Sequence, residues 1–221
     1  MDKQKQIFLE NEGDNWFSRN LDGLLSNDDF KDLNTIFEFI QNDFKILEIG
    51  CSFGKKLDVI RRKKIDLNLS LHGIDPSKKS IDKGKELFKK IDLKVGTSDL
   101  LSFKDNTFDL VILGFCLYLV DRDLIFKTVS EVDRVLKPGR FIVITDFEPT
   151  YPYRKKYHHL DGIYSFKNNY SNFFLGGSHY SLVKKELFSH SVSSFDPLID
   201  ERVSTSVLYK EIYDEIYELK K

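Results

Sequence analysis

Short apolar runs alternate with segments of helical periodicity between residues 45 and 145, and this alternation limits the fold more than any other feature of the chain. Strand, helix and strand repeated in this way predict a parallel sheet with helices on both faces. Nearly continuous apolar strands fit such a sheet, because both of its faces are covered. The expected strands are residues 45–49, 70–74, 91–95, 107–113 and 140–145, with helices over 55–64, 77–90 and 121–136.

A glycine-containing turn, residues 50–54, follows the first expected strand and leads into a helix. Ligands of open α/β sheets bind beside such a loop, and glycine lets the backbone approach them closely. The dinucleotide fingerprint G-x-G-x-x-G fails at its second and third glycines. A second pattern, an acidic residue, any residue and then Gly-x-Gly-x-Gly, is matched by Glu48, Gly50 and Gly54, with Ser52 replacing the middle glycine. A tight turn that binds nothing is the simpler alternative.

Two aspartates stand where the next strands end. Asp75 follows the second strand, roughly 20 residues after the loop, where an acidic side chain can accept both hydroxyls of an adenosine ribose. Asp75 could instead only cap the next helix, although Ser77 is an equally good cap. Asp99 follows the third strand at the carboxyl edge of the sheet, where a carboxylate can accept the amino group of adenine. A solvated loop residue is the alternative for Asp99.

Taken in order and with residues 131–139, these segments resemble the class I methyltransferases that depend on S-adenosylmethionine (SAM), of the small-molecule, metal-independent kind. The resemblance covers about residues 44–147. It implies a Rossmann-like α/β fold with a seven-stranded, mostly parallel sheet, helices on both faces, and an antiparallel last strand near the fifth. An alternating segment at residues 203–209 suits that late strand. SAM is the implied cofactor and S-adenosylhomocysteine the implied product.

By position, the resemblance assigns parts of the cofactor to particular side chains. Glu48 helps to hold the loop and the amino group, Asp75 binds the ribose and Asp99 reads the adenine. Residues 13–20 look like the lid segment of some small bacterial methyltransferases, from which Arg19 could pair with the SAM carboxylate; a surface Arg19 is equally compatible. The full set implied for the cofactor is Arg19, Glu48, Gly50, Cys51, Ser52, Gly54, Asp75, Pro76, Ser98, Asp99, Leu100, Gly114 and Phe115.

Methyl transfer from a sulfonium is an in-line displacement, so alignment and desolvation supply most of the catalysis. A base is needed only when the acceptor must lose a proton. His158 and His159 are candidates because an ordinary histidine titrates near neutral pH, although surface histidines are the alternative. Tyr118 and Asp146 lie where the acceptor is expected. Asp146 alone does not make a magnesium site, so no metal is expected.

The acceptor is expected to be a small molecule methylated on an O or N atom, with a weak hint of sugar- or glycan-related substrates. A net charge of -1 and the absence of an Asn/Asp-Pro-Pro-aromatic stretch after the fourth strand argue against nucleic acid. A non-catalytic SAM-binding module or partner subunit is the main alternative. An NAD-dependent oxidoreductase is the other, and the failed fingerprint argues against it.

The chain reads as one domain over residues 1–221: a helical lid over 1–42, the SAM-binding core over 43–148, and an acceptor-side elaboration with late antiparallel strands over 149–221. Its longest apolar run is far shorter than the roughly 20 residues that span a bilayer, so no membrane partner is expected. Cys51 and Cys116 are too few for a disulfide framework and indicate small buried residues and a cytoplasmic protein. The oligomeric state is left open.

Overall fold

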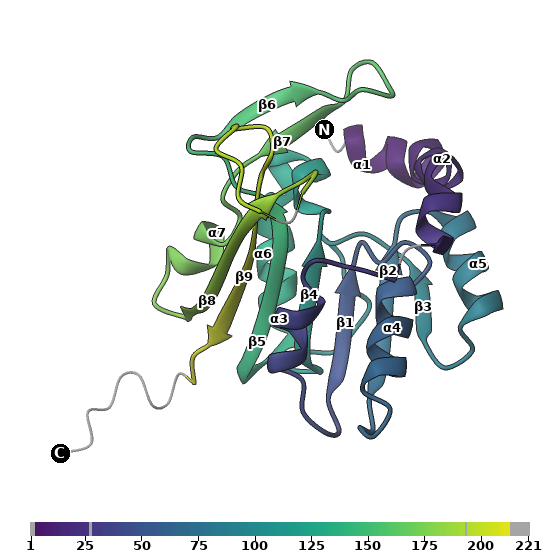
Figure 1. The fold of residues 1–221 in the computed structure, drawn as a ribbon, viewed down its shortest axis with the longest axis vertical. Coiled ribbons are helices and arrows are strands. Elements are labelled where there is room, and N and C mark those ends of the chain that lie inside the picture. Colours follow the sequence, from purple (N-terminus) through teal and green to yellow (C-terminus); the bar gives the residue numbers. More distant parts are fainter. Residues whose placement is uncertain (1–2, 27, 193, 213–221) are drawn as a thin grey trace.

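A seven-stranded sheet in the order β3-β2-β1-β4-β5-β9-β8 forms the centre of the computed structural model, which describes residues 3–26, 28–192 and 194–212 (Figure 1). Strands β3, β2, β1, β4 and β5 are parallel, whereas β9 is antiparallel to both β5 and β8. The strands are β1 Lys45–Ile49, β2 Ser70–Asp75, β3 Asp92–Val95, β4 Phe108–Gly114, β5 Leu136–Phe147, β8 Tyr180–Ser189 and β9 Arg202–Lys210. The predicted fold, including the antiparallel last strand beside the fifth, is confirmed.

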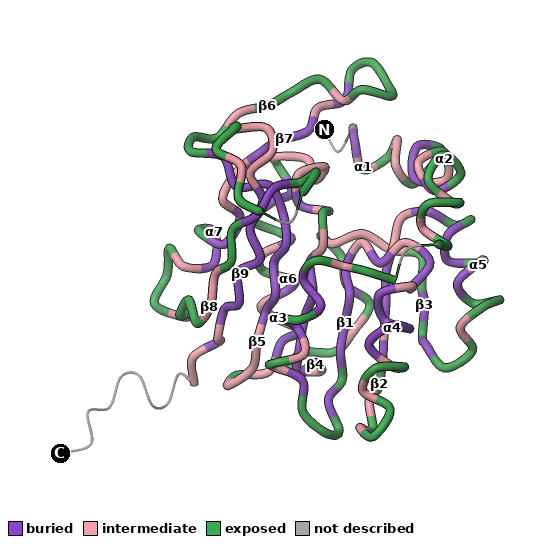
Figure 2. Tube along the Cα trace, in the orientation of Figure 1, coloured by how far each residue is buried: buried purple, intermediate pink, exposed green. Residues whose placement is uncertain are grey.

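Side chains of the central strands point alternately to two hydrophobic layers, which explains their unbroken apolar sequences. In β4, Leu110 and Ile112 join the layer beneath α3, α4 and α5, while Val111 and Leu113 join the layer beneath α6 and α7. The buried strands stand out along the middle of the molecule in Figure 2. These helices are α3 Leu33–Glu38, α4 Lys55–Lys63, α5 Lys78–Leu87, α6 Ile125–Val135 and α7 Asn172–Leu175.

The helix expected over residues 121–136 is shorter at its start. A 3-10 turn, η3 Arg122–Leu124, precedes α6 and another, η2 Leu117–Leu119, follows β4. The helix ends just before the Lys-Pro-Gly stretch, as the terminator predicts, but that stretch then forms a bulge at the beginning of β5. Phe108 pairs with Leu136 and Leu110 with Phe141, so the β5 side has extra residues there, with Gly139 at φ 73°.

Two segments lie over the carboxyl ends of the parallel strands (Figure 1). One contains α1 Lys3–Ile7, a π-helical turn η1 Phe8–Glu12 and α2 Gly13–Ser26; the other is a hairpin of β6 Tyr153–Lys156 and β7 Tyr164–Lys167. Gln4 joins the two, because its side chain donates to the Leu119 carbonyl (2.9 Å) and accepts from the Tyr164 N–H (2.8 Å). We call α1, η1 and α2 the N-terminal cover. Among the described helices, none has the length and apolar character needed to cross a membrane.

Two helical glycines predict opposite effects of the same substitution. A Cβ on Gly84 of α5 would lie 2.3 Å from the Phe53 carbonyl oxygen, whereas one on Gly23 of α2 would meet nothing within 4 Å. Gly84→Ala is expected to lower the free energy of unfolding by about 1–3 kcal/mol, because the helix must move off the sheet. Gly23→Ala should raise it by up to about 1 kcal/mol through helix propensity. Urea unfolding measures both, and equal effects would contradict the close packing of α5.

Candidate functional site

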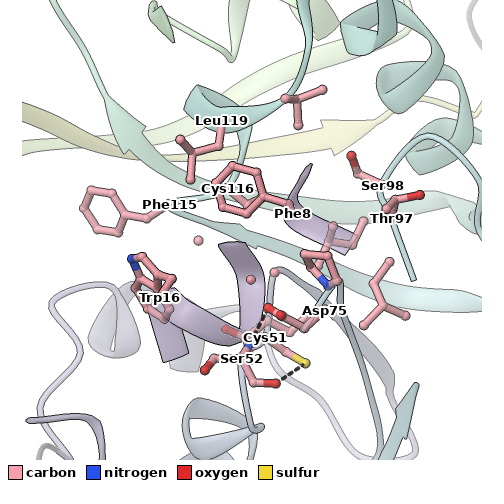
Figure 3. A pocket seen from close by; sticks show the side chains of 18 of the residues that line it. Phe8, Trp16, Cys51, Ser52, Asp75, Thr97, Ser98, Phe115, Cys116 and Leu119 are labelled. Carbon is pink, nitrogen blue, oxygen red and sulfur yellow. Dashed lines mark hydrogen bonds between the residues drawn. The ribbon is translucent and has the colours of Figure 1, made fainter. Parts of the chain in front are cut away.

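A cavity of about 540 Å³ lies between the carboxyl ends of the parallel strands and the N-terminal cover. Figure 3 shows side chains of the cover, such as Trp16, and of the sheet, such as Asp75 and Phe115, gathered around it. Its volume is in the range of small-molecule sites. The predicted site residues that line it are Glu48, Gly50, Cys51, Ser52, Asp75, Pro76, Ser98, Asp99, Gly114, Phe115 and Tyr118.

The glycine loop is held against the end of β2. The N–H groups of Gly50 and Cys51 both donate to the Ile74 carbonyl (2.9 and 3.0 Å), and the Ser52 N–H donates to Asp75 Oδ2 (2.8 Å). Gly50 has φ 74° and lies so close to Cys116 that a Cβ would stand 2.7 Å from that residue's Cβ. Ser52 adopts φ 49°, a left-handed backbone conformation that strains a serine more than the glycine it replaces in the pattern. Gly54, which does not line the cavity, begins α4 at φ 84°.

Asp75 both supports the loop and faces the cavity. Its carboxylate also accepts from the Ser77 N–H (2.9 Å), while the Ser77 hydroxyl caps α5 by accepting from Ser80. The N-cap of α5 is therefore Ser77 and not Asp75, and binding of a ribose by Asp75 stays a prediction. Burial raises the pKa of Asp75 to about 6, against the hydrogen bonds that favour its charged form. The carboxylate oxygens can still accept ligand hydroxyls, since each has further lone pairs.

A buried lysine lies beside Glu48 at the end of β1. Lys56 Nζ donates to Asp32 Oδ2 (2.6 Å) and stands 3.7 Å from Glu48 Oε1. Burial raises the pKa of Glu48 to about 7, and Lys56 counteracts only part of that effect. Burial also works against the Lys56 ammonium, but the two carboxylates outweigh it and raise its pKa. Sequence reasoning missed Lys56, because a lysine in the first turn of a helix usually faces solvent.

Of the residues predicted to bind the adenine, Ser98 and Asp99 line the cavity and Leu100 does not. Asp99 faces the cavity, but its Oδ2 accepts from Lys5 Nζ of the N-terminal cover (2.7 Å). Burial alone would raise the pKa of Asp99, and the Lys5 hydrogen bond turns the shift downward. Leu100 does not line the cavity and is 67% exposed. Arg19 does not line it either: its guanidinium binds Glu12, which also accepts from the Tyr157 hydroxyl (3.0 Å).

The predicted acceptor-side residues are separated by the fold. Tyr118 lines the cavity, and burial raises the pKa of its hydroxyl. Asp146 lies behind the wall, where it accepts from the N–H groups of Leu117 (3.1 Å), Tyr118 (3.3 Å) and Phe147 (2.8 Å). Burial raises its pKa to about 7. His158 and His159 are exposed in the turn of the β6–β7 hairpin and do not line the cavity.

His190, which sequence reasoning missed, lines the cavity together with Phe115 and Phe147. It follows β8 and is more than 40 residues from either neighbour in sequence, so no local pattern marked it. Phe115 itself has φ 50°, which turns the chain sharply after β4.

The comparisons with known proteins agree with this geometry. A family model described as a methyltransferase domain matches residues 46–139. A demethylmenaquinone methyltransferase of Staphylococcus aureus is 31% identical over 125 residues, 55% of this chain and 51% of that protein. A tRNA N(3)-methylcytidine methyltransferase of Schizosaccharomyces pombe is 29% identical over 54% of this chain and 41% of its own. This chain contains a class I SAM-dependent methyltransferase domain.

A SAM-dependent methyltransferase of Methanosarcina mazei has the same fold, with a TM-score of 0.67 and 19% identity over 80% of this chain and 97% of its own. The chain spans about half the length of the first curated relatives. The family implies SAM as the cofactor, and the methyltransferase cavity fits it. Within the described residues, Glu48 Oε2 and Ser52 Oγ are buried without a hydrogen-bond partner, and both belong to residues that line the cavity. A ligand with polar groups would satisfy both atoms.

Removing the carboxylate of Glu48 by substitution is expected to stabilise the folded protein in a pH-dependent way. The folded protein holds the Glu48 proton more tightly than the unfolded chain, so ionisation destabilises it as the pH rises from the usual 4.5 to about 7. Glu48→Gln should therefore stabilise the ligand-free protein at pH 8 by on the order of 3 kcal/mol, and very little at pH 4. Urea unfolding at both pH values measures this. A Glu48→Gln variant less stable than the parent at pH 8 would contradict a destabilising buried carboxylate.

Lys56 predicts selectivity for the amino-acid end of the cofactor. Its ammonium lines the cavity beside Glu48, so the pair matches the opposite charges of an α-amino acid. Lys56→Met should weaken the binding of S-adenosylhomocysteine about tenfold or more. It should leave unchanged the affinity of 5′-methylthioadenosine, which lacks the amino-acid end. Calorimetric titration measures both. Because the variant leaves the Asp32 carboxylate without its ammonium partner, the double variant with Asp32→Asn is the control. Equal losses for the two ligands would refute the assignment.

Proposed function

We propose that this protein transfers the methyl group of SAM to an O or N atom of a small molecule. The single observation that supports this most strongly is that one cavity has two kinds of lining. Glu48 and Asp75 line it, and so does an aromatic group in which the His190 ring packs against Phe115 and Phe147. One cavity can thus hold donor and acceptor in line, which is what this displacement requires. The activated donor supplies the methyl group, while the chain orients both partners and excludes water.

The lining of the acceptor side favours a compact acceptor with an apolar or planar body. Many of the lining side chains are aromatic or aliphatic; they include Phe8, Trp16, Phe30, Phe115, Tyr118 and Leu119. Asn20 and His190 are among the polar lining residues, and Lys56 Nζ lies 5.4 Å from the centre of the Phe30 ring. Such a surface suits an aromatic ring better than a sugar or glycan, whose many hydroxyls need many polar partners. The N-terminal cover also leaves less room for a folded RNA than for a small molecule.

The cofactor assignment predicts which ligands stabilise the protein. A ligand at 100 times its dissociation constant stabilises by about 2.7 kcal/mol, or roughly 5–10 °C for a chain of this size. S-adenosylhomocysteine and SAM should both produce this shift in a thermal-unfolding experiment, and NAD should not. Asp75→Asn should weaken binding of S-adenosylhomocysteine by about tenfold or more, because it removes a charged acceptor from the ribose.

Asp82→Asn is the matched control, since Asp82 lies exposed on α5 beside Lys78 and away from the cavity. A shift with NAD alone would overturn the interpretation of the loop. If none of the three ligands raised the unfolding temperature, a competent cofactor site would be refuted. Binding without transfer of a labelled methyl group from SAM to any small-molecule fraction of a cell extract would favour the non-catalytic module instead.

A further inference from the structure

The imidazole of His190 is fixed at the mouth of the methyltransferase cavity. Its backbone N–H donates to the Glu201 carbonyl (2.7 Å), and its carbonyl accepts from Lys31 Nζ (3.0 Å). The ring stacks on Phe147 with centroids 5.4 Å apart and planes at 27°. It also meets Phe115 at 5.7 Å and 82°. In the part of the chain that the structure describes, neither ring nitrogen has a hydrogen-bond partner, so both are available to a ligand.

The surroundings of His190 favour a neutral ring. Burial has the largest effect on the pKa of His190 and lowers it. The Glu201 carboxylate raises this pKa, and the ammonium groups of Lys167 and Lys31 lower it further. The net pKa lies below the usual value for histidine, so at neutral pH the ring can accept a proton. Its place at the exposed mouth lets that proton leave to solvent.

The four residues that the sequence analysis offered as bases are less suited to take a proton. Asp146 is occupied by three backbone N–H groups. Tyr118 is protonated at neutral pH even at its usual pKa, and burial raises that pKa further. His158 and His159 stand in the β6–β7 turn, away from the cavity lining.

We propose that His190 is the base of this methyltransferase site, and that the acceptor presents an acidic O–H or N–H on a planar ring. The proposal rests on the proposed methyl transfer. The acceptor loses its proton to an imidazole nitrogen and forms a new bond to the methyl carbon through the freed electron pair. The methyl–sulfur bond breaks, its electrons stay on sulfur, and the proton passes to solvent. The aromatic faces of Phe115 and Trp16 line the space where such a ring would lie.

A pair of probe molecules tests this without knowledge of the natural acceptor. Protein saturated with S-adenosylhomocysteine is titrated with 1-naphthol and with naphthalene, which differ only by the hydroxyl. The parent protein should bind 1-naphthol about three- to tenfold more tightly, because one hydrogen bond to the neutral ring contributes that much. The preference should fall as the pH drops through the His190 pKa. His190→Phe keeps the stacking on Phe147 and should abolish both the preference and its pH dependence.

His158→Phe and His159→Phe are matched controls that should retain the preference, because their rings lie outside the cavity. Equal binding of the two probes by the parent protein, or an unchanged preference in His190→Phe, would overturn the role of His190. Failure to bind either probe would overturn the planar acceptor. Failure of the proposed function can be told apart from these outcomes, because S-adenosylhomocysteine itself would then not bind.

A proton NMR titration of the five histidines provides a second measurement. The resonance that is missing in His190→Phe identifies His190, and its pKa should lie below the usual value of histidine. A pKa at or above that usual value would overturn the proposal, because the cavity would then not favour the neutral ring that takes the acceptor's proton.

Discussion

Three hydrogen bonds between the glycine loop and the end of β2 organise the whole site. Two of them converge on the Ile74 carbonyl and the third reaches the Asp75 carboxylate. They turn the backbone through the positive φ values of Gly50 and Ser52, and the turn brings Gly50 against Cys116 from the chain after β4. The ends of three neighbouring strands therefore meet at one point, and the cavity opens directly above it. A parallel sheet creates such a place because all its carboxyl ends lie on one edge.

The same edge collects carboxylates in surroundings that disfavour their charge. Burial raises the pKa of Glu48, Asp75 and Asp146, yet the three are satisfied to different degrees. Asp146 has its N–H donors from the chain and shapes the wall, whereas Glu48 retains an oxygen with no partner among the described residues. A buried polar atom without a partner costs stability in the folded protein, and a bound ligand can recover it. Stability and binding are thus opposed at Glu48.

The sequence by itself determined the order of the strands and helices along the chain and the position of the glycine loop. Alternating apolar runs fix which segments become buried strands, since only a sheet covered on both faces suits them. The spacing of Gly50, Gly54 and Asp75 is local to one strand–helix–strand unit, so it could be interpreted without knowledge of distant contacts. The alternating pattern at residues 203–209 predicted a late strand, and the family resemblance implied that it is antiparallel; both are confirmed as β9 beside β5.

Only the tertiary structure decided which distant side chains share the cavity. Arg19 pairs with Glu12 seven residues earlier, while Lys56 is buried against Asp32 and Glu48. His190 lines the cavity because it directly follows β8 and its ring packs on Phe147, whereas His158 and His159 lie exposed in the turn of the β6–β7 hairpin. Periodicity and motif spacing fix neighbours within a few residues. The direction of a loop depends on packing and hydrogen bonds between segments far apart in the chain, which a single sequence does not encode in any local pattern.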